Sequence, residues 1–130
     1  MKVLVVDDSA FMRKILMDLI GQTKWAGSEI LEAGDGDEAI LKCQSGKPDL
    51  LLLDIVMPGK DGIAVLKEIG GTAPSVVIVS SMGQETVITE AKSLGAKDYI
   101  VKPFDAKLVI ESLNKLYPET VPPAALAPVS

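Results

Sequence analysis

Short apolar runs alternate along the chain with segments whose apolar residues recur at a spacing of three or four. The spaced segments fit amphipathic helices; Met12, Ile15 and Leu19, for example, fall on one helical face. Runs that are apolar throughout are typical of strands in a parallel sheet with helices on both faces. The pattern predicts an α/β fold with five strands, near residues 2–6, 29–33, 50–53, 75–79 and 98–101. It also predicts a last helix over about 105–116, with Asp105 as its N-cap.

Four of the predicted strands are followed directly by a polar residue. Asp7 and Asp8 follow the first strand, Asp54 the third, Ser80 the fourth and Lys102 the fifth. Because the strands of a parallel sheet all point one way, residues just past their carboxyl ends collect in one crevice, where open α/β folds bind ligands. We therefore expect three carboxylates, one hydroxyl and one ammonium to share a small site.

Three neighbouring carboxylates repel one another unless a cation neutralises them. Mg²⁺ is a hard cation that prefers oxygen ligands, so the acids predict a magnesium site with acyl-phosphate chemistry beside it. Asp54, on a rigid strand end, is the predicted nucleophile and would form an aspartyl phosphate. Simpler interpretations stay open: Asp7 and Asp8 as a helix-capping pair, Asp54 as a loop acid before a turn, and Lys102 as a solvated surface charge.

Composition narrows the class of protein. The 130 residues suffice for one domain with its own core, and no apolar run approaches the ~20 residues that span a bilayer. No secretory signal is visible and Cys43 is the only cysteine, which favours a cytoplasmic protein without membrane insertion. Cys43 lies on an apolar helical face and is expected to pack in the core. The net charge of −5, without a basic cluster, argues against nucleic-acid binding.

Four separated motifs carry a resemblance to a known family. They are VLVVDDSAFMR, LLLDIVMPGKDG, VIVSSMG and GAKDYIVKPF, in this order. Together they resemble the receiver domain of two-component response regulators, and within that family most closely the single-domain chemotaxis regulators. The resemblance covers residues 1–117 and implies a flavodoxin-like, doubly wound (βα)5 three-layer sandwich with strand order 2-1-3-4-5. Residues 118–130, rich in proline and alanine, are expected to form a tail or linker.

The same resemblance implies roles around the predicted metal. Asp8 is implied as a direct magnesium ligand, Asp7 as a ligand through water, and the Met57 carbonyl as a further ligand beside Asp54. Asp54 is implied as the phosphoacceptor. Lys102 would place its ammonium on one oxygen of the phosphoryl group.

Further residues are implied on the phosphoryl side of the site. The bond between Lys102 and Pro103 is typically cis in this family, which would aim the lysine into the crevice. The Ser80 hydroxyl would donate to a phosphoryl oxygen. An alternative stays open here, because Ser81 and Gln84 fit a helix capping box, so the serines could serve only to start a helix.

The resemblance also implies a switch residue and two residues that tune dephosphorylation. Tyr99 takes the place of the family's switch aromatic, although a tyrosine in a strand can also serve only in packing. Val56 and Met82 occupy positions that are polar in many receivers. Because both are apolar here, they cannot orient an attacking water, and we expect slow loss of the phosphoryl group.

The sequence thus predicts a phosphorylation-dependent signalling switch in chemotaxis or motility. A partner histidine kinase would donate the phosphoryl group, since the chain has no histidine of its own. A downstream protein would bind the face of the fourth helix, fifth strand and fifth helix, and a phosphatase is a possible further partner. The chain would act as an enzyme only on its own phosphorylation state. Two alternatives stay open: the receiver portion of a longer response regulator, and a magnesium-dependent phosphohydrolase.

Overall fold

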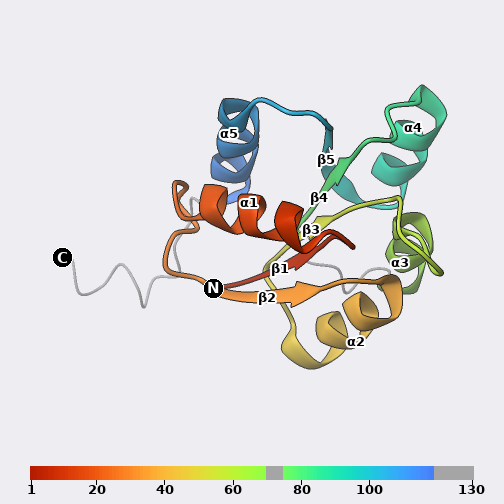
Figure 1. Ribbon diagram of the computed structural model, residues 1–130, viewed down its shortest axis with the longest axis horizontal. Coiled ribbons are helices and arrows are strands. Elements are labelled where there is room, and N and C mark those ends of the chain that lie inside the picture. Colours follow the sequence, from red (N-terminus) through yellow and green to blue (C-terminus); the bar gives the residue numbers. More distant parts are fainter. Residues whose placement is uncertain (70–74, 119–130) are drawn as a thin grey trace.

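A computed structural model describes residues 1–69 and 75–118. Five strands and five helices alternate along these residues (Figure 1). Their bounds are β1 Lys2–Val6, α1 Ala10–Ile20, β2 Glu29–Ala33, α2 Gly36–Gly46, β3 Leu50–Leu53, α3 Gly62–Ile69, β4 Ser75–Ser80, α4 Glu85–Ser93, β5 Ala96–Val101 and α5 Ala106–Leu116. All strand pairs are parallel and the sheet order is β2-β1-β3-β4-β5. The predicted fold class and strand order are confirmed.

The core lies in two layers, one on each face of the sheet. Alternate residues of a strand point to opposite faces, so Leu4 and Val6 pack in one cluster while Val3 and Val5 pack in the other. Helices α2, α3 and α4 cover the first face, and α1 and α5 cover the second. Figure 1 shows these two groups of helices on opposite sides of the strands. The result is the three-layer sandwich that the apolar strands predict.

Strand β5 begins two residues earlier than predicted. It starts at Ala96 because its pairing with β4 contains a register shift: Val76 pairs with Ala96, whereas Val77 pairs with Asp98. Lys97 is the extra residue of this bulge, and it breaks the apolar pattern from which the strand was predicted. Strand β4 also extends one residue further, to Ser80.

Three helices start at capping residues that the sequence offers. Ser9 caps α1, Asp35 caps α2, and Asp105 caps α5 as predicted. The alternative capping role of Ser81 is wrong. Helix α4 begins only at Glu85 with Gln84 as its N-cap and no side-chain cap bond. The Ser80 hydroxyl accepts a hydrogen bond from the Met82 amide at 3.2 Å, which turns the chain before the helix can start.

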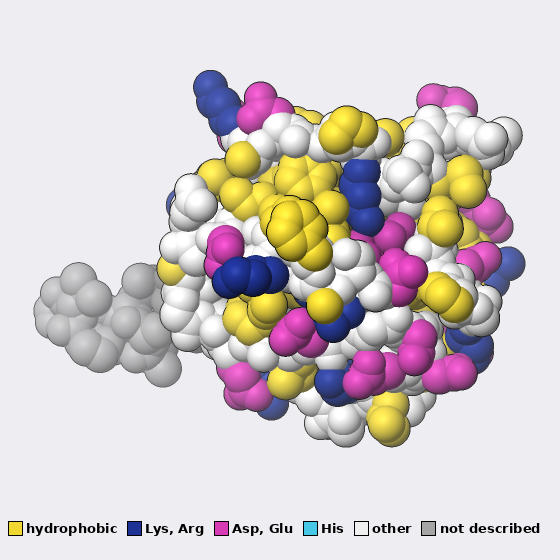
Figure 2. Space-filling model, in the orientation of Figure 1, with side chains coloured by type: hydrophobic (Ala, Val, Ile, Leu, Met, Phe, Trp, Pro, Cys, Tyr) yellow, Lys and Arg dark blue, Asp and Glu magenta, His cyan; other side chains and the backbone are white. Residues whose placement is uncertain are grey.

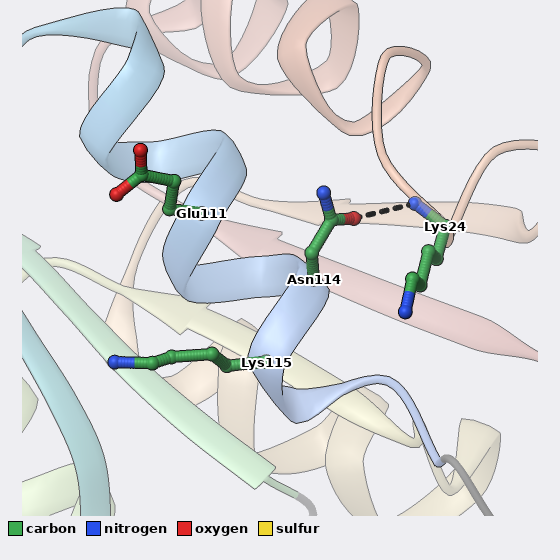
Figure 3. A pocket seen from close by; sticks show the side chains of 4 residues that line it. All are labelled: Lys24, Glu111, Asn114 and Lys115. Atoms are coloured by element: carbon green, nitrogen blue, oxygen red, sulfur yellow. Dashed lines mark hydrogen bonds between the residues drawn. The ribbon is translucent and has the colours of Figure 1, made fainter.

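The amino end of the sheet is closed by the loop between α1 and β2. Trp25 is buried there, its Nε1 donates to the Leu113 carbonyl of α5 at 2.8 Å, and its ring meets the edge of Tyr117. A groove of about 420 Å³ lies beside this contact, where the Lys24 amide donates to Asn114 Oδ1 at 2.8 Å (Figure 3). Trp25 thus serves in packing and ties α5 to the loop.

Cys43 behaves as the pattern predicts. It packs against the core cluster beneath α2, and burial raises the pKa of its thiol to about 11. A thiol with such a pKa stays protonated at neutral pH and is a poor nucleophile.

The surface carries charges of both signs. Figure 2 shows hydrophobic side chains gathered in the upper part of the drawn face, with acidic and basic side chains around them. Within the described residues, no helix has the length and apolar character needed to cross a bilayer.

Candidate functional site

The carboxyl ends of β1 and β3 bring three acids together. Asp7 and Asp54 directly follow these neighbouring strands and are 1% and 4% exposed, whereas Asp8 is exposed. One carboxylate oxygen from each acid lies within 4.8 Å of the others. The convergence predicted from the parallel sheet is therefore present.

Lys102 at the end of β5 reaches into this acid cluster. Its Nζ lies 2.7 Å from Asp7 Oδ2 and 3.0 Å from Asp54 Oδ2. Burial by itself would lower the pKa of Lys102, but the bonds to the two carboxylates outweigh it and the pKa is raised. The interpretation of Lys102 as a solvated surface charge is wrong. The bond from Lys102 to Pro103 is cis, as the family resemblance implies.

The carboxylate oxygens that do not contact Lys102 differ in their hydrogen bonds. Asp7 Oδ1 accepts from the Ser9 amide at 2.9 Å, and Asp54 Oδ1 accepts from the Val56 amide at 3.0 Å. Asp8 makes no side-chain hydrogen bond within the described part of the chain. Because the N-cap of α1 is Ser9, the interpretation of the acid pair as a helix cap is wrong.

Glycines hold the turn after Asp54 in place. Gly59 has a φ of 75°, a backbone conformation that L side chains rarely adopt. Gly62 starts α3 so close to β3 that a Cβ there would lie 2.4 Å from the Asp54 carbonyl oxygen. The helix is thus packed directly on the backbone of Asp54. Met57, in the turn, is buried, and the ligand role of its carbonyl stays a prediction.

Ser80 at the end of β4 and Tyr99 of β5 both bond to Met82, in the loop that follows β4. Ser80 is fully buried at the end of β4, and the Tyr99 hydroxyl donates to the Met82 carbonyl two residues later. Tyr99 is half-buried and packs against the core cluster. Burial raises the pKa of Tyr99, although the Ser80 hydroxyl acts to lower it. The tyrosine is therefore attached to the loop that follows Ser80.

The two positions predicted to tune dephosphorylation lie on turns that follow the site. Val56 is 47% exposed and Met82 is partly buried, and both side chains are apolar. One residue outside the predicted set also touches the site: the Arg13 guanidinium donates to the Asp7 main-chain carbonyl. Its only signal in the sequence is its place in the DDSAFMR motif.

The donor set fits a hard divalent cation. It consists of three carboxylates at close range, of which Asp8 is the most open to solvent. Carboxylate oxygens are the ligands that Mg²⁺ takes in proteins, usually one or two of them together with waters. The site residues therefore suit the predicted metal.

Comparisons with known proteins agree with this geometry. The family model for the response regulator receiver domain matches residues 3–114. Chemotaxis protein CheY of Thermotoga maritima is 48% identical over 118 residues, covering 88% of this chain and 96% of that protein. Chemotaxis protein CheY of Bacillus subtilis is 42% identical over 117 residues, with 88% and 95% covered.

A solved structure shares the fold at similar coverage. The CheX–CheY–BeF3–Mg²⁺ complex from Borrelia burgdorferi contains a chain with a TM-score of 0.81 and 33% identity, covering 91% of this chain and 90% of that one. The segment matched by the family model includes every strand end of the acid site. The chain therefore belongs to the response regulator receiver domain family of two-component systems, with CheY chemotaxis proteins among its relatives.

Proposed function

We propose that this receiver domain is a phosphorylation-dependent switch that takes a phosphoryl group onto Asp54 with the help of Mg²⁺. The observation that carries the proposal is the Lys102 ammonium held between Asp7 and Asp54 at the strand ends. A cation fixed beside a carboxylate nucleophile suits phosphoryl transfer, in which catalysis is mainly positioning and electrostatic stabilisation.

The reaction can be written from the residues in place. A carboxylate oxygen of Asp54 attacks the phosphorus of a phosphohistidine on a partner kinase, forming an O–P bond while the N–P bond breaks. The electron pair of that bond returns to the imidazole, which takes a proton. Lys102 and the Ser80 hydroxyl bind phosphoryl oxygens. Mg²⁺, held by Asp7, Asp8, Asp54 and the Met57 carbonyl, would offset the charge of the acids and the phosphoryl group.

The switch would run through the loop that follows Ser80. When the Ser80 hydroxyl turns to the phosphoryl group, it gives up its bond to the Met82 amide, and the Met82 carbonyl is the acceptor for Tyr99. A change at Ser80 is thereby passed to β5 and to the neighbouring α4 and α5. We propose this α4-β5-α5 face as the binding site for a downstream protein in chemotaxis signalling.

The proposal extends to partners and to a cellular location. We propose a histidine kinase, a downstream target and a phosphatase as partners of this chain. The Borrelia complex, in which a CheY is bound to CheX, supports binding of a second protein. We propose a cytoplasmic location and a receiver domain that spans residues 1–117, in agreement with the end of α5 at Leu116. Residues 119–130 of the predicted tail lie outside the described part of the chain. The receiver chemistry is the same whether the chain acts alone or within a longer regulator.

Mass spectrometry after incubation with acetyl phosphate tests the proposal. Wild type should gain one phosphoryl group on Asp54 with Mg²⁺ and none in chelator, and Asp54→Ala should gain none. Asp18→Ala removes an exposed acid of α1 and should behave like wild type. Modification of Asp54→Ala at the wild-type yield would refute the assignment. Steady turnover of phosphate monoesters would instead identify a phosphohydrolase.

A further inference from the structure

Arg13 of α1 bridges the acid pair and the neighbouring strand. Its Nη1 donates to the Asp7 main-chain carbonyl at 2.6 Å, and its Nε donates to Glu32 Oε1 at 2.9 Å. The Arg13 side chain is only 18% exposed. These contacts involve main chain at the metal site, yet Arg13 touches none of the three carboxylates.

The Asp7 carbonyl needs a donor because the sheet ends beside it. The pairing of β1 with β2 stops at Val6 and Ala33, and the Asp7 amide makes the last ladder bond, to the Ala33 carbonyl at 3.1 Å. Beyond this point the chain leaves β2 and enters α2, and no main-chain amide of the described residues donates to the Asp7 carbonyl. The Arg13 guanidinium takes the place of the missing strand donor.

Glu32, which pairs with Arg13, is also held at its main chain, because its carbonyl accepts a hydrogen bond from Lys42 Nζ. A groove of about 190 Å³ is lined by Arg13, Glu32, Gly34, Glu38 and Lys42. Glu38 accepts from the Gly34 amide at 2.8 Å, a bond that lowers the pKa of Glu38, and Lys42 pairs with Glu38 at 3.3 Å. The guanidinium is therefore held between Asp7 and Glu32, and a shift of the Asp7 carbonyl away from Glu32 would lengthen one of these two bonds.

We propose that Arg13 is a positioning residue that sets the direction of Asp8 and thereby the affinity of the site for Mg²⁺. The inference rests on the proposed magnesium site. The Asp7 carbonyl and the Asp8 amide belong to one planar peptide unit. Fixing the carbonyl therefore fixes the positions of the Asp8 nitrogen and Cα. Asp8 has no side-chain partner among the described residues, and its carboxylate therefore depends on the backbone for its place.

Charge alone predicts the opposite effect. A guanidinium near a cation site repels the cation, so removing it would tighten Mg²⁺ binding if Arg13 acted only through its charge. If Arg13 acts by positioning, its loss weakens binding despite the removed repulsion. The direction of the change in Kd therefore separates the two roles.

Isothermal titration with Mg²⁺ provides the test, on wild type, Arg13→Met, Arg13→Lys and Lys14→Met. Arg13→Lys keeps the charge but cannot hold both Asp7 and Glu32, so we expect about tenfold weaker binding for both Arg13 variants. Lys14→Met removes a cation from an exposed position on the same helix and should change the Kd by no more than about twofold. Thermal melts in chelator establish that each variant is folded.

Each result has a distinct meaning. Tighter or unchanged binding by Arg13→Met, or wild-type binding by Arg13→Lys, would overturn the role of Arg13 while leaving the magnesium site intact. If Arg13→Met fails to fold, Arg13→Lys alone decides. Absence of Mg²⁺ binding by wild type would overturn the proposed site and this inference with it.

Discussion

The two ends of the sheet hold their buried polar groups in opposite ways. At the amino end, the Trp25 indole donates to Leu113, and the Thr23 hydroxyl both donates to Ile20 and accepts from the Trp25 amide. Each of these groups finds a neutral partner within the fold. At the carboxyl end, two buried carboxylates share one ammonium, and a third faces solvent. The comparison separates groups that serve the fold from groups to which we assign the proposed reaction.

Trp25→Ala should show the largest effect, and it should be confined to stability. Truncating a fully buried tryptophan costs about 3–5 kcal/mol in the free energy of unfolding. We expect the same loss in chelator and in Mg²⁺, since Trp25 lies at the end of the sheet away from the acids. Urea melts under both conditions measure it. A loss that Mg²⁺ reverses would mean that the two ends are coupled.

Lys102→Met should instead produce a loss that depends on the metal. Removing the ammonium leaves Asp7 and Asp54 buried without their cation, which costs about 3 kcal/mol in chelator. Mg²⁺ should restore most of this stability, while phosphorylation of Asp54 by acetyl phosphate should nearly cease. Lys14→Met is the control, because Lys14 is 73% exposed and far less buried than Lys102. Equal losses in chelator and Mg²⁺ would contradict the expectation.

The raised pKa of Lys102 gives this contact a pH signature. The stabilisation from the ion pairs is fully present below the ordinary lysine pKa of 10.5, and it disappears as the pH rises through the higher folded-state value. Metal-free wild type should therefore lose stability at alkaline pH more steeply than Lys102→Met. Parallel pH curves for the two proteins would argue against a charged Lys102 in the folded state.

Val56→Asn combined with Met82→Glu should change only the rate of dephosphorylation at the carboxyl end of the sheet. Polar side chains at these positions can orient a water towards the aspartyl phosphate, and we expect about tenfold faster autodephosphorylation, or about 1.4 kcal/mol in the barrier. Decay of phosphorylated protein in excess Mg²⁺ measures the rate. Trp25→Phe is the control and should decay like wild type. A double variant that decays more slowly would show that access to the phosphoryl group limits the reaction.

Asp7→Asn and Asp8→Asn should shift stability in opposite directions by small amounts. Asp7 is paired with Lys102, so its substitution should lower metal-free stability by about 1 kcal/mol. Asp8 is exposed and only adds repulsion, so its substitution should raise stability by about 0.5 kcal/mol. Both should weaken Mg²⁺ binding. Melts in chelator that move the same way for both variants would refute this asymmetry.

The sequence predicted which residues lie at the site better than it predicted the local backbone around them. The residues at the strand ends could be predicted because apolar runs stop sharply at Asp7, Asp54 and Lys102. Parallel strands bring the residues after their carboxyl ends to one edge of the sheet. The bulge at Lys97 was missed because an extra residue interrupts the apolar pattern without leaving a signal of its own. The alternative of a helix start at Ser81 was wrong because the Ser80 hydroxyl holds the Met82 amide, and α4 begins only at Glu85.

The hydrogen bond from Arg13 to the Asp7 carbonyl could not be predicted from the sequence, for a different reason. It depends on where the ladder between β1 and β2 ends, and that point is set by the turn of β2 towards α2. Periodicity places Arg13 on a helix but does not say which carbonyl lies opposite its guanidinium. The same holds for the unequal burial of Asp7 and Asp8, two adjacent residues of the same type.

Lys102 also affects how the protein can fold in the absence of metal. Because the ammonium is covalently part of the chain, the acids have a counter-ion from the moment that β5 joins the sheet, whatever the supply of free metal. A newly synthesised molecule can therefore reach its folded state first and bind the proposed Mg²⁺ afterwards. Under the proposed function, a shortage of Mg²⁺ would stop phosphorylation while the fold stays intact, and added Mg²⁺ would restore phosphorylation without refolding.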